Sequence, residues 1–433
     1  MAMKRVLIIT YYWPPTGGSG VQRWVKFSKY LPSQGWQPVI YTPENPERSA
    51  FDGSLLDDIP ECAEIIRTSI REPYAVYRKF QRQSEVNPIN SRKNGLFKKL
   101  SVFVRGNFFI PDPRVSWVRP SVRYLKEYLR EHPVDAIVTT GPPQSMHLIG
   151  LGLMEALRKD NPAGPVPRWI VDFRDPWTEM FYFKHLALLP FAKRRHFKLE
   201  QKVLDGADCI ISVTPLVRED FQRKTSTPVE LITNGFDEED FTYRGEQEPD
   251  ALFRVVHTGL FSEDGNPFSL WRALAGRCGK DAEFRRALRI CLAGKVDRGI
   301  IDAIVGSGLE ENLETPGYLP HTETVVLQRK AAVLILPLRH EPEYRKVLPG
   351  KIFEYLAARR PVLGIGQEDG AAAKVLSDSG SGVMFDWDRE AEMDGFIGDV
   401  WEEFRRNGGP REIDNDIEEY TRKALTGRLA RIL

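Results

Sequence analysis

The sequence contains few cysteines, and they do not cluster. Its four cysteines, Cys62, Cys209, Cys278 and Cys291, stand singly, without a CxxC pair or a neighbouring histidine. Both a zinc site and a disulfide framework need cysteines at close, repeated spacing. We therefore expect free thiols in a reducing compartment and no metal site.

Long apolar runs are also missing. No segment approaches the ~18 apolar residues that are needed to span a bilayer. The N-terminal residues MAMKR lead directly into VLIIT, which is too short for the apolar core of a signal peptide. The expected location is the cytoplasm.

No charge of one sign dominates, because 61 Lys and Arg residues face 60 Asp and Glu residues. A general nucleic-acid-binding protein would show a basic excess, so nucleic acid is not an expected partner. The 433 residues are 42% hydrophobic and 28% charged, close to globular averages. This composition excludes a mostly disordered or fibrous chain, and the length suits two or three domains.

Short apolar, β-branched runs alternate with helix-length segments, which is typical of parallel α/β sheets. The predicted strands are 6–11, 38–42, 65–68, 136–140, 169–173, 209–213 and 229–233, followed by 254–258, 288–293, 312–315, 332–337, 361–365 and 382–385. An acidic stretch without periodicity, residues 234–250, separates the two series and suggests a linker. We predict two Rossmann-like domains, residues 1–240 and 251–412.

The last segment, residues 413–433, is predicted to be a helix. Ile413, Ile417, Tyr420 and Ala424 recur at helical spacing. Acidic residues lie early and basic residues late in the segment, as the helix dipole favours.

Ligands of open parallel sheets bind at the carboxyl ends of strands, so the loops there are searched first. After the first strand, Gly17, Gly18 and Gly20 lie in a predicted strand-to-helix turn. Glycine allows close backbone approach, and the helix N-terminus offers N–H groups to an anion or a sugar hydroxyl. Arg23 stands where a dinucleotide fingerprint would need glycine, which disfavours a dehydrogenase. A tight turn without a ligand is the alternative.

Two later strands also end in polar residues. His147 opens the helix after the fourth strand, and DFRDPW places Asp172, Arg174, Asp175 and Trp177 at the end of the fifth. Carboxylates, a guanidinium and an aromatic ring suit carbohydrate binding through hydrogen bonds and stacking. The alternatives are a structural histidine and an Asp175 that caps a helix and pairs with Arg174.

The segment EYRKVLPGKIFEYLAARRPVLGIG predicts a helix that begins near Pro349. Lys351 and Glu354 are three residues apart and share one face of this helix. A diphosphate could meet the helix N-terminus and Lys351, while Glu354 accepts the ribose hydroxyls. The alternative is an ordinary surface ion pair.

Five motifs together resemble the retaining glycosyltransferases of family 4: YYWPPTGGSGVQR, DFRDPW, ITNGFD, HTGLFS and PGKIFEYLAARRPVL. The resemblance implies the GT-B fold, in which two Rossmann-like domains have parallel sheets that face each other across a cleft. It also implies a nucleotide sugar in the C-terminal domain, an acceptor in the N-terminal domain, and a final helix, 413–433, that crosses back to the N-terminal domain.

The resemblance also assigns roles to residues. Glu354 matches the family's glutamate at the ribose, Gly18 and Gly20 match its glycine loop, and His147 resembles a histidine near the transferred sugar. Lys346 stands where a second glutamate is usual, and the loop GLFSEDGNP lacks the usual Arg and Lys. The predicted catalytic residues are Lys351, Arg345, His147 and Asp172, and the predicted substrate-binding residues are Gly17, Gly18, Gly20, Arg174, Asp175, Asn234, Lys346 and Glu354.

From these features we expect a hexosyltransferase that works with retention and without a metal or cofactor. Its donor would be a nucleotide-diphosphate sugar, and its acceptor a glycan or lipid-linked hydroxyl in the synthesis of a surface polysaccharide or glycolipid. Two alternatives remain open: a nucleotide-sugar 2-epimerase, and a degenerate partner protein that binds nucleotide sugar without turnover.

A basic, aromatic stretch runs from Tyr77 to Phe109, with eight Lys or Arg residues and the single acid Glu85. The residues predicted to share one helical face are Leu96, Phe97, Leu100, Phe103 and Val104. Such a helix can lie on an anionic membrane, which would place the protein at the inner face of the cell membrane. The alternative is a helix whose apolar face packs on its own domain.

Overall fold

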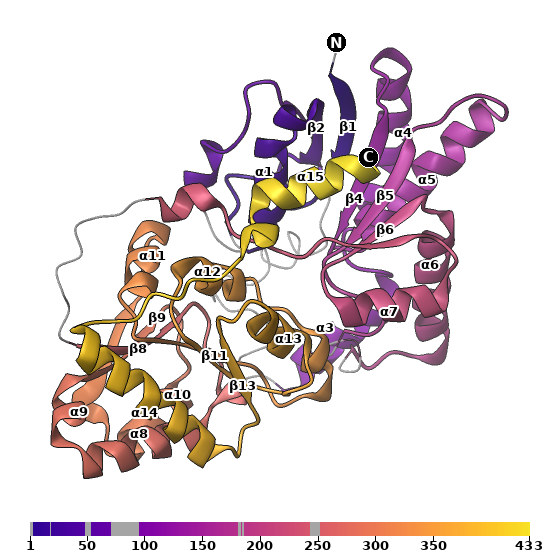
Figure 1. Cartoon of the computed structure of the whole chain (residues 1–433). Helices are drawn as coiled ribbons and strands as arrows, with labels where there is room; N and C mark the ends of the chain where they lie inside the picture. The colour runs from indigo at the N-terminus through magenta and orange to yellow at the C-terminus, as the bar shows by residue number, and fades with distance from the viewer. Residues whose placement is uncertain are drawn as a thin grey trace. The chain divides into compact units, whose positions relative to one another are not determined.

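The computed structural model describes residues 3–17, 19–47, 53–70, 95–180, 183, 186–242 and 252–433 (Figure 1). The chain divides into two compact units. The first unit comprises residues 1–233 and 425–433, and the second comprises residues 234–424.

The first unit contains a seven-stranded parallel sheet in the order β3-β2-β1-β4-β5-β6-β7. Its strands are β1 (Lys4–Ile9), β2 (Trp36–Pro43), β3 (Glu64–Thr68), β4 (Ala136–Gly141), β5 (Arg168–Phe173), β6 (Cys209–Ser212) and β7 (Val229–Leu231). Val6 and Ile8 point to one face of β1 and Leu7 and Ile9 to the other, and all four are fully buried. The continuous apolar run is therefore a strand that helices cover on both faces.

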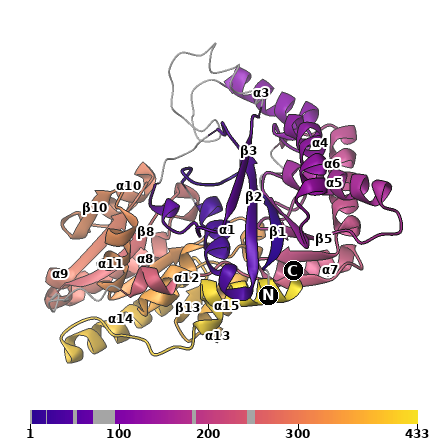
Figure 2. The same cartoon turned by 90° about the horizontal axis from the view of Figure 1, so that it is seen from above.

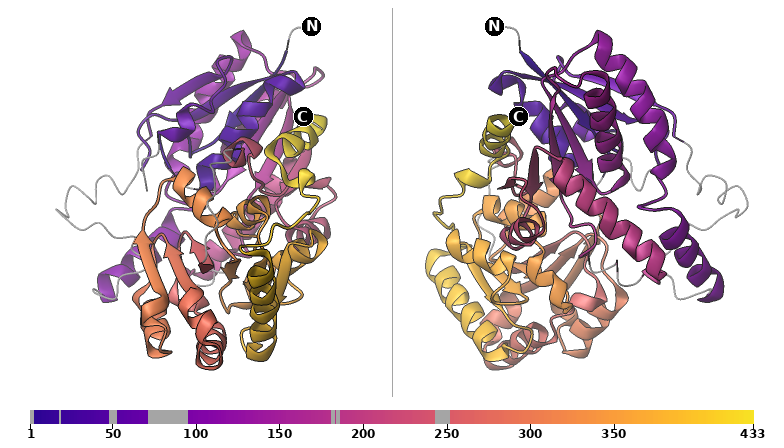
Figure 3. Two further views of the ribbon diagram at one scale, coloured as in Figure 1. Left: turned by 60° about the vertical axis from the view of Figure 1, so that its left-hand side comes forward. Right: turned by 90° about the vertical axis from the view of Figure 1, so that its right-hand side faces the viewer.

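The helices of the first unit form two layers. They are α1 (Ser19–Tyr30), α3 (Gly95–Phe108), α4 (Val115–Glu131), α5 (Ser145–Asp160), α6 (Pro190–Gly206), α7 (Pro215–Lys224) and, from Leu425, α15 (Arg422–Ile432). Helices α4 to α7 cover one face, while α1 and α15 cover the other (Figure 2). Helix α3 lies beside α6 (Figure 3).

The second unit contains a six-stranded parallel sheet in the order β10-β9-β8-β11-β12-β13. Its strands are β8 (Phe253–Thr258), β9 (Leu288–Ala293), β10 (Leu313–Gly317), β11 (Val333–Pro337), β12 (Val362–Ile365) and β13 (Gly382–Phe385). Its helices are α8 (Phe268–Lys280), α9 (Ala282–Ala287), α10 (Arg298–Gly306), α11 (His321–Arg329), α12 (Lys351–Ala358), α13 (Ala371–Asp378) and α14 (Glu390–Asn407). Helices α8, α9, α10 and α14 cover one face, and α12 and α13 pack on the other.

In each sheet the strand order reverses at one point. Strand β1 lies between β2 and β4, and β8 lies between β9 and β11. The crevice at the carboxyl ends of two such strands is the usual ligand site of a doubly wound sheet. The sheet topology therefore predicts ligand sites at the loops after β1 and β4, and at those after β8 and β11.

All thirteen predicted strands are present, and two Rossmann-like sheets are confirmed. The domain boundaries differ from our expectation, because residues 234–240 and 413–424 fall in the second unit. Phe236 forms a bridge with Thr421 and packs in one cluster with Ile417 and Tyr420. The predicted linker therefore begins with a segment that belongs to the second unit.

The predicted helix over residues 413–433 is wrong in its first part. Residues 413–417 are not helical, a short 3-10 turn spans Glu418–Tyr420, and α15 begins only at Arg422. Ile413 instead hydrogen-bonds through its backbone to Arg359, and Tyr420 packs against Phe353 of α12. Burial against α12 therefore explains the apolar spacing that suggested a helix.

Two smaller predictions can also be compared with the structure. All four cysteines are free thiols. The basic stretch from Tyr77 to Phe109 lies mostly outside the described residues, although a helix, α3, is present from Gly95 onward. The side chains of Leu96, Phe97 and Leu100 also lie outside the described part, while Val104 is exposed.

Candidate functional site

Lys351 is the first residue of α12, and its side chain reaches the loop after β8. Its ammonium nitrogen Nζ lies 3.1 Å from Nε2 of His257 and 3.4 Å from the carbonyl oxygen of Leu260. The other ring nitrogen of His257, Nδ1, lies 3.2 Å from the carbonyl oxygen of Ile335 in β11. Nε2 also lies 3.3 Å from the carbonyl oxygen of Leu260. Only the tautomer that is protonated at Nδ1 lets Nε2 accept from Lys351, because an ammonium group can only donate.

Burial lowers the pKa of both partners. Burial, and then the charge of Lys351, lowers the pKa of His257 well below its ordinary value, so this ring is neutral at pH 7. Burial lowers the pKa of Lys351 to about 8, against the opposing charge of Glu354. The ammonium of Lys351 is therefore held at the β8–β11 switch point by two neutral acceptors.

A glycine forms the turn beside this contact. Gly259, directly after β8, has a φ of 94°, and a Cβ atom there would lie 3.5 Å from Nζ of Lys351. Gly259 therefore supplies a left-handed turn that most residues would adopt only with strain.

Glu354 lies on the same helix and is tied to the same strand. Nε2 of Gln328 donates to Oε2 of Glu354 over 3.2 Å and to Oγ1 of Thr258 over 3.1 Å. The hydroxyl of Tyr355 accepts from the backbone N–H of Thr258 over 3.1 Å. These bonds fix the first turns of α12 against the carboxyl end of β8.

Three other predicted residues belong to the second unit. Arg345 forms an ion pair of 2.9 Å with Asp369, and both side chains are exposed. Lys346 follows it in the same 3-10 turn, Pro342–Lys346, and is partly buried. Asn234 is the first residue of the second unit and is also partly buried. Their predicted roles stay predictions.

A groove of about 920 Å³ lies between α11 and strands β9 and β10 of the second unit. Arg254 and Glu314 line it and pair with each other over 3.0 Å. This groove contains none of the predicted donor-binding residues.

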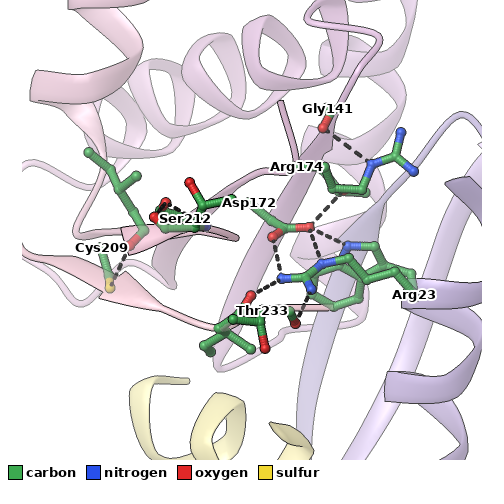
Figure 4. Close-up of polar contacts among 12 residues, drawn as sticks. Arg23, Gly141, Asp172, Arg174, Cys209, Ser212 and Thr233 are labelled. Carbon is green, nitrogen blue, oxygen red and sulfur yellow. Dashed lines mark hydrogen bonds and ion pairs between the residues drawn. The ribbon is translucent and has the colours of Figure 1, made fainter. Parts of the chain in front are cut away.

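In the first unit, Arg174 connects the loops at the β1–β4 switch point. Its guanidinium lies 3.4 Å from the carbonyl oxygen of Gly141 through Nε and 3.2 Å from that of Pro142 through Nη2 (Figure 4). A Cβ atom at Gly20 would lie 2.6 Å from Nη1 of Arg174. The absence of a side chain at Gly20 thus lets the guanidinium lie over the first turn of α1. Gly17 is buried in the preceding loop, and Gly18 lies outside the described residues.

Several buried polar atoms near these loops have no hydrogen-bond partner among the described residues. They are Nε1 of Trp13, Oγ1 of Thr16, both amide atoms of Gln144 and Nε2 of His147. Buried polar groups are normally satisfied, so such a group of atoms indicates a place that water or a ligand completes. Sequence analysis identified only His147 in this group.

His147 is fully buried at the start of α5. Its Nδ1 lies 3.0 Å from Oγ1 of Thr139, and a Cβ atom at Gly141 would collide with its Nε2. Burial lowers the pKa of His147 to about 3, so the imidazole is neutral at pH 7. A neutral ring can exchange a hydrogen bond with a sugar hydroxyl, but it cannot supply positive charge.

Asp172 is also fully buried, in a network with α1 (Figure 4). Its carboxylate accepts from Arg23 over 2.9 Å, from Nε1 of Trp24 over 2.7 Å and from Oγ1 of Thr140 over 2.9 Å. Burial favours a higher pKa for Asp172, but the charge of Arg23 and these hydrogen bonds hold it below its usual value. Arg23 further donates to the carbonyl oxygens of Ile232 and Thr233. This geometry suits a structural role, and the catalytic role of Asp172 stays an untested prediction.

Asp175 differs from Asp172, because it is only partly buried and no hydrogen bond to it is found among the described residues. Burial raises its pKa, against the opposing charge of Arg174. Residues 176–180 are not helical, so Asp175 is not a helix cap. Trp177, expected as a stacking surface, is instead buried, and its Nε1 donates to Nδ1 of His196 over 3.1 Å.

Several residues of these two sites were not predicted, among them His257, Gln328 and Gln144. His257 is the second-last residue of β8, in the motif HTGLFS, so its place near a carboxyl end was a usable signal. The two glutamines carry no such signal, because only their packing distinguishes them from other glutamines. Within the described residues, no group of three or more His, Cys, Asp or Glu side chains could hold a metal ion, and no helix is long and apolar enough to cross a membrane.

The model of glycosyltransferase family 4 matches residues 18–240, which is just over half of the chain. The chain belongs to this family. No curated protein matches it in sequence.

Solved structures define the fold. A glycosyltransferase from Rickettsia africae ESF-5 has a TM-score of 0.59 and 11% identity, covering 100% of this chain and 98% of the other. TarM of S. aureus, determined as a variant with UDP and alpha-GlcNAc-glycerol, has a TM-score of 0.55 and 11% identity, covering 99% of both chains. A putative UDP-N-acetylglucosamine 2-epimerase from Listeria monocytogenes has a TM-score of 0.55 and 10% identity, covering 99% of this chain and 95% of the other. The fold is that of the GT-B glycosyltransferases.

Proposed function

We propose that this protein transfers a sugar from a nucleotide-diphosphate sugar to the hydroxyl of a glycan or lipid-linked acceptor, with retention and without a metal. The observation that carries the proposal is the position of Lys351. Its ammonium lies at the N-terminus of α12 and at the switch point of the second sheet, where an anionic leaving group can be stabilised.

The donor is proposed to bind to the second unit. An ammonium has three protons, and the contacts of Lys351 with His257 and Leu260 use two of them. The third proton is available for a phosphate oxygen. Oε2 of Glu354 already accepts a hydrogen bond from Gln328, so Oε1 can accept one from a ribose hydroxyl.

The acceptor is proposed to bind to the first unit. Gln144 and His147 offer neutral polar atoms that have no partner among the described residues, while Arg174 and Asp175 add one charge of each sign nearby. Mixed neutral and charged groups of this kind suit several hydroxyls better than they suit a polyanion.

The reaction builds negative charge on the diphosphate as the glycosidic bond breaks. Fixed positive groups and N–H dipoles that face this charge lower the barrier. We propose that Lys351 supplies this charge, with Arg345 and Lys346 in supporting roles. The acceptor hydroxyl attacks on the face that the phosphate leaves, so that its proton can pass to the departing phosphate oxygen.

Thermal-shift screening against a panel of nucleoside-diphosphate sugars tests donor binding, because a ligand that binds only the folded protein raises its midpoint. We expect one base and sugar to give a shift that Lys351→Ala reduces. Lys280→Ala is a matched control, since Lys280 is an exposed lysine at the end of α8 in the same unit. Equal shifts in both variants would contradict the phosphate role of Lys351.

The 2-epimerase alternative has a structural neighbour in the Listeria protein. Incubation with the donor alone separates the two functions. An epimerase converts the nucleotide sugar without an acceptor, whereas a transferase needs one. A degenerate partner protein would bind the donor and convert nothing.

The same proposal includes attachment of the stretch from Tyr77 to Phe109 to an anionic membrane, where lipid-linked acceptors lie. Sedimentation with vesicles that contain or lack anionic lipid tests it. Lack of binding at low salt would remove this part of the proposal and leave the transferase untouched.

A further inference from the structure

Helix α6 presents exposed phenylalanines and cations to solvent on its N-terminal half. Its buried row is Ala192, His196 and Glu200, four residues apart. The residues on the remaining faces of this half, Phe191, Lys193, Arg194, Arg195, Phe197 and Lys198, are all exposed. Phe191 is 53% exposed and Phe197 44%.

The end of α3 extends this surface. Nδ2 of Asn107 donates to the carbonyl oxygen of Ala187 over 3.2 Å, and the backbone N–H of Leu189 donates to Oδ1 of Asn107 over 2.6 Å. A Cβ atom at Gly106 would lie 2.9 Å from Leu188, so α3 packs closely on the segment that leads into α6 (Figure 3). This packing places Phe108, which is 67% exposed, beside the start of α6.

The exposed phenylalanines are concentrated here. Among the described residues, the exposed phenylalanines are Phe108, Phe191, Phe197 and Phe268, and the first three belong to this surface. Val104 and Leu189 add two further exposed apolar side chains. A concentration of this kind on a monomer indicates a contact surface.

The charge of the surface is of one sign. Its described cations are Arg105, Lys193, Arg194, Arg195 and Lys198, and residues 102–108 and 186–199 contain no Asp or Glu. The nearest acid on α6, Glu200, is buried and accepts from Thr178. No ion pair of Lys193, Arg194, Arg195 or Lys198 is found within the described part of the chain.

We propose that this surface, which we call the α3–α6 face (Val104, Arg105, Phe108, Leu189, Phe191, Lys193, Arg194, Arg195, Phe197 and Lys198), docks on an anionic lipid bilayer. The phenylalanines enter the interface between headgroups and acyl chains, and the cations lie at the level of the anionic headgroups. Charge complementarity indicates what binds there, because a surface with five cations and no acid matches a uniformly anionic plane. The inference deepens the membrane attachment proposed above, and it does not depend on sugar transfer.

Flotation with vesicles of phosphatidylglycerol and phosphatidylcholine tests the proposal on the full-length protein. We expect the wild type to bind vesicles that contain phosphatidylglycerol, and to bind less as salt is raised because the attraction is screened. The double variant Phe191→Ser with Phe197→Ser should bind these vesicles about tenfold or more weakly, since it lacks the two rings that would insert into the bilayer. Phe268→Ser is the matched control, because Phe268 is 56% exposed on α8 of the second unit.

A second pair of variants isolates the charge. Arg194→Gln with Lys198→Gln should weaken binding and reduce its salt dependence. The control pair, Lys280→Gln with Arg286→Gln, removes two exposed cations of the second unit and should change neither. Circular dichroism and the thermal midpoint verify folding, and donor-induced thermal shifts verify the nucleotide-sugar site in every variant.

Three outcomes would overturn the proposal. One is a wild type that does not bind phosphatidylglycerol vesicles at low salt, and another is a phenylalanine variant that binds as the wild type does. The third is a wild type that light scattering shows to be a dimer, with the phenylalanine variant monomeric and no vesicle binding in either. That result would assign the surface to a protein partner. Because donor-induced shifts are measured separately, failure of the membrane proposal and failure of the transferase proposal give different results.

Discussion

The ammonium nitrogen of Lys351 lies 3.1 Å from Nε2 of His257, and this contact joins the start of α12 to the end of β8. Both groups are displaced from their ordinary pKa values by burial, and in the same direction. The imidazole is neutral and can accept, while the amine keeps its proton below about pH 8. The pair therefore places a positive charge at the β8–β11 switch point, where the sheet topology favours binding of an anion.

The first prediction concerns pH. The pKa of Lys351 is lowered to about 8 in the folded protein, and the protonated form is the one that can bind phosphate. The value of kcat/KM for the donor should therefore be high below pH 8 and fall as the pH rises through 8, since kcat/KM reports the free enzyme. Lys351→Arg keeps its charge and should lose this alkaline limb, whatever rate remains. An identical limb in both proteins would assign the titration to another group.

The second prediction concerns the charge itself. Lys351→Ala should reduce turnover about 10²–10³-fold, because it removes a fixed positive group from the developing phosphate charge. The thermal midpoint should change little, since the side chain is only partly buried and its amine already carries a cost of burial. Lys280→Ala should keep wild-type turnover. Equal turnover in the two variants would refute the role.

A third prediction follows from the unpartnered amide of Gln144. Both of its polar atoms are buried and form no hydrogen bond among the described residues, so Gln144→Met should not destabilise the fold. If the amide binds an acceptor hydroxyl, KM for the acceptor should rise about tenfold. Gln201→Met is the opposite control, because Nε2 of Gln201 donates to Oδ1 of Asp205 and to the backbone carbonyl oxygen of Lys224. It should lower the thermal midpoint and leave KM for the acceptor unchanged. Steady-state kinetics and thermal unfolding together distinguish the two behaviours.

The fourth prediction uses the space above Gly20. A Cβ atom there would lie 2.6 Å from Nη1 of Arg174, so Gly20→Ala must displace the guanidinium. Alanine is favoured over glycine within a helix by about 1 kcal/mol, so stability should not fall. We expect turnover to fall at least about tenfold while the thermal midpoint is kept or rises. Gly276→Ala on α8, where a Cβ atom meets nothing within 4 Å, should keep turnover unchanged.

The fifth prediction distinguishes a structural role of Asp172 from a catalytic one. Arg23→Ala and Asp172→Ala should each destabilise the protein by roughly 3–5 kcal/mol, because each leaves a buried charge without its partner. The double variant should be less destabilised than the sum of the two, which urea unfolding measures. Because the pKa of Asp172 is lowered, its stabilising effect is complete above its unfolded pKa of about 4 and is lost as the pH falls. A stable Asp172→Ala protein without turnover would instead support the catalytic role.

The local sequence was sufficient to predict the strands. Runs such as Val6 to Ile9 and Val333 to Leu336 are apolar over their whole length, and only a strand covered on both faces buries every residue of such a run. The helix that carries Lys351 and Glu354 could also be predicted, because glycine and proline mark its start and its apolar residues recur at helical spacing. Sequence therefore determined two parallel sheets and the loops in which to search.

Tertiary packing decided the rest, for one physical reason: hydrogen bonds and burial join residues that are far apart in the chain. Asp172 and Asp175 are three positions apart, yet one is fixed by Arg23, 149 residues away, and the other has no partner among the described residues. Spacing also suggested a helix at Ile413 to Tyr420, but these side chains are buried by α12 instead. His257 could be identified as a site residue only from the fold, which brings Lys351, 94 residues later in the chain, to its Nε2 atom.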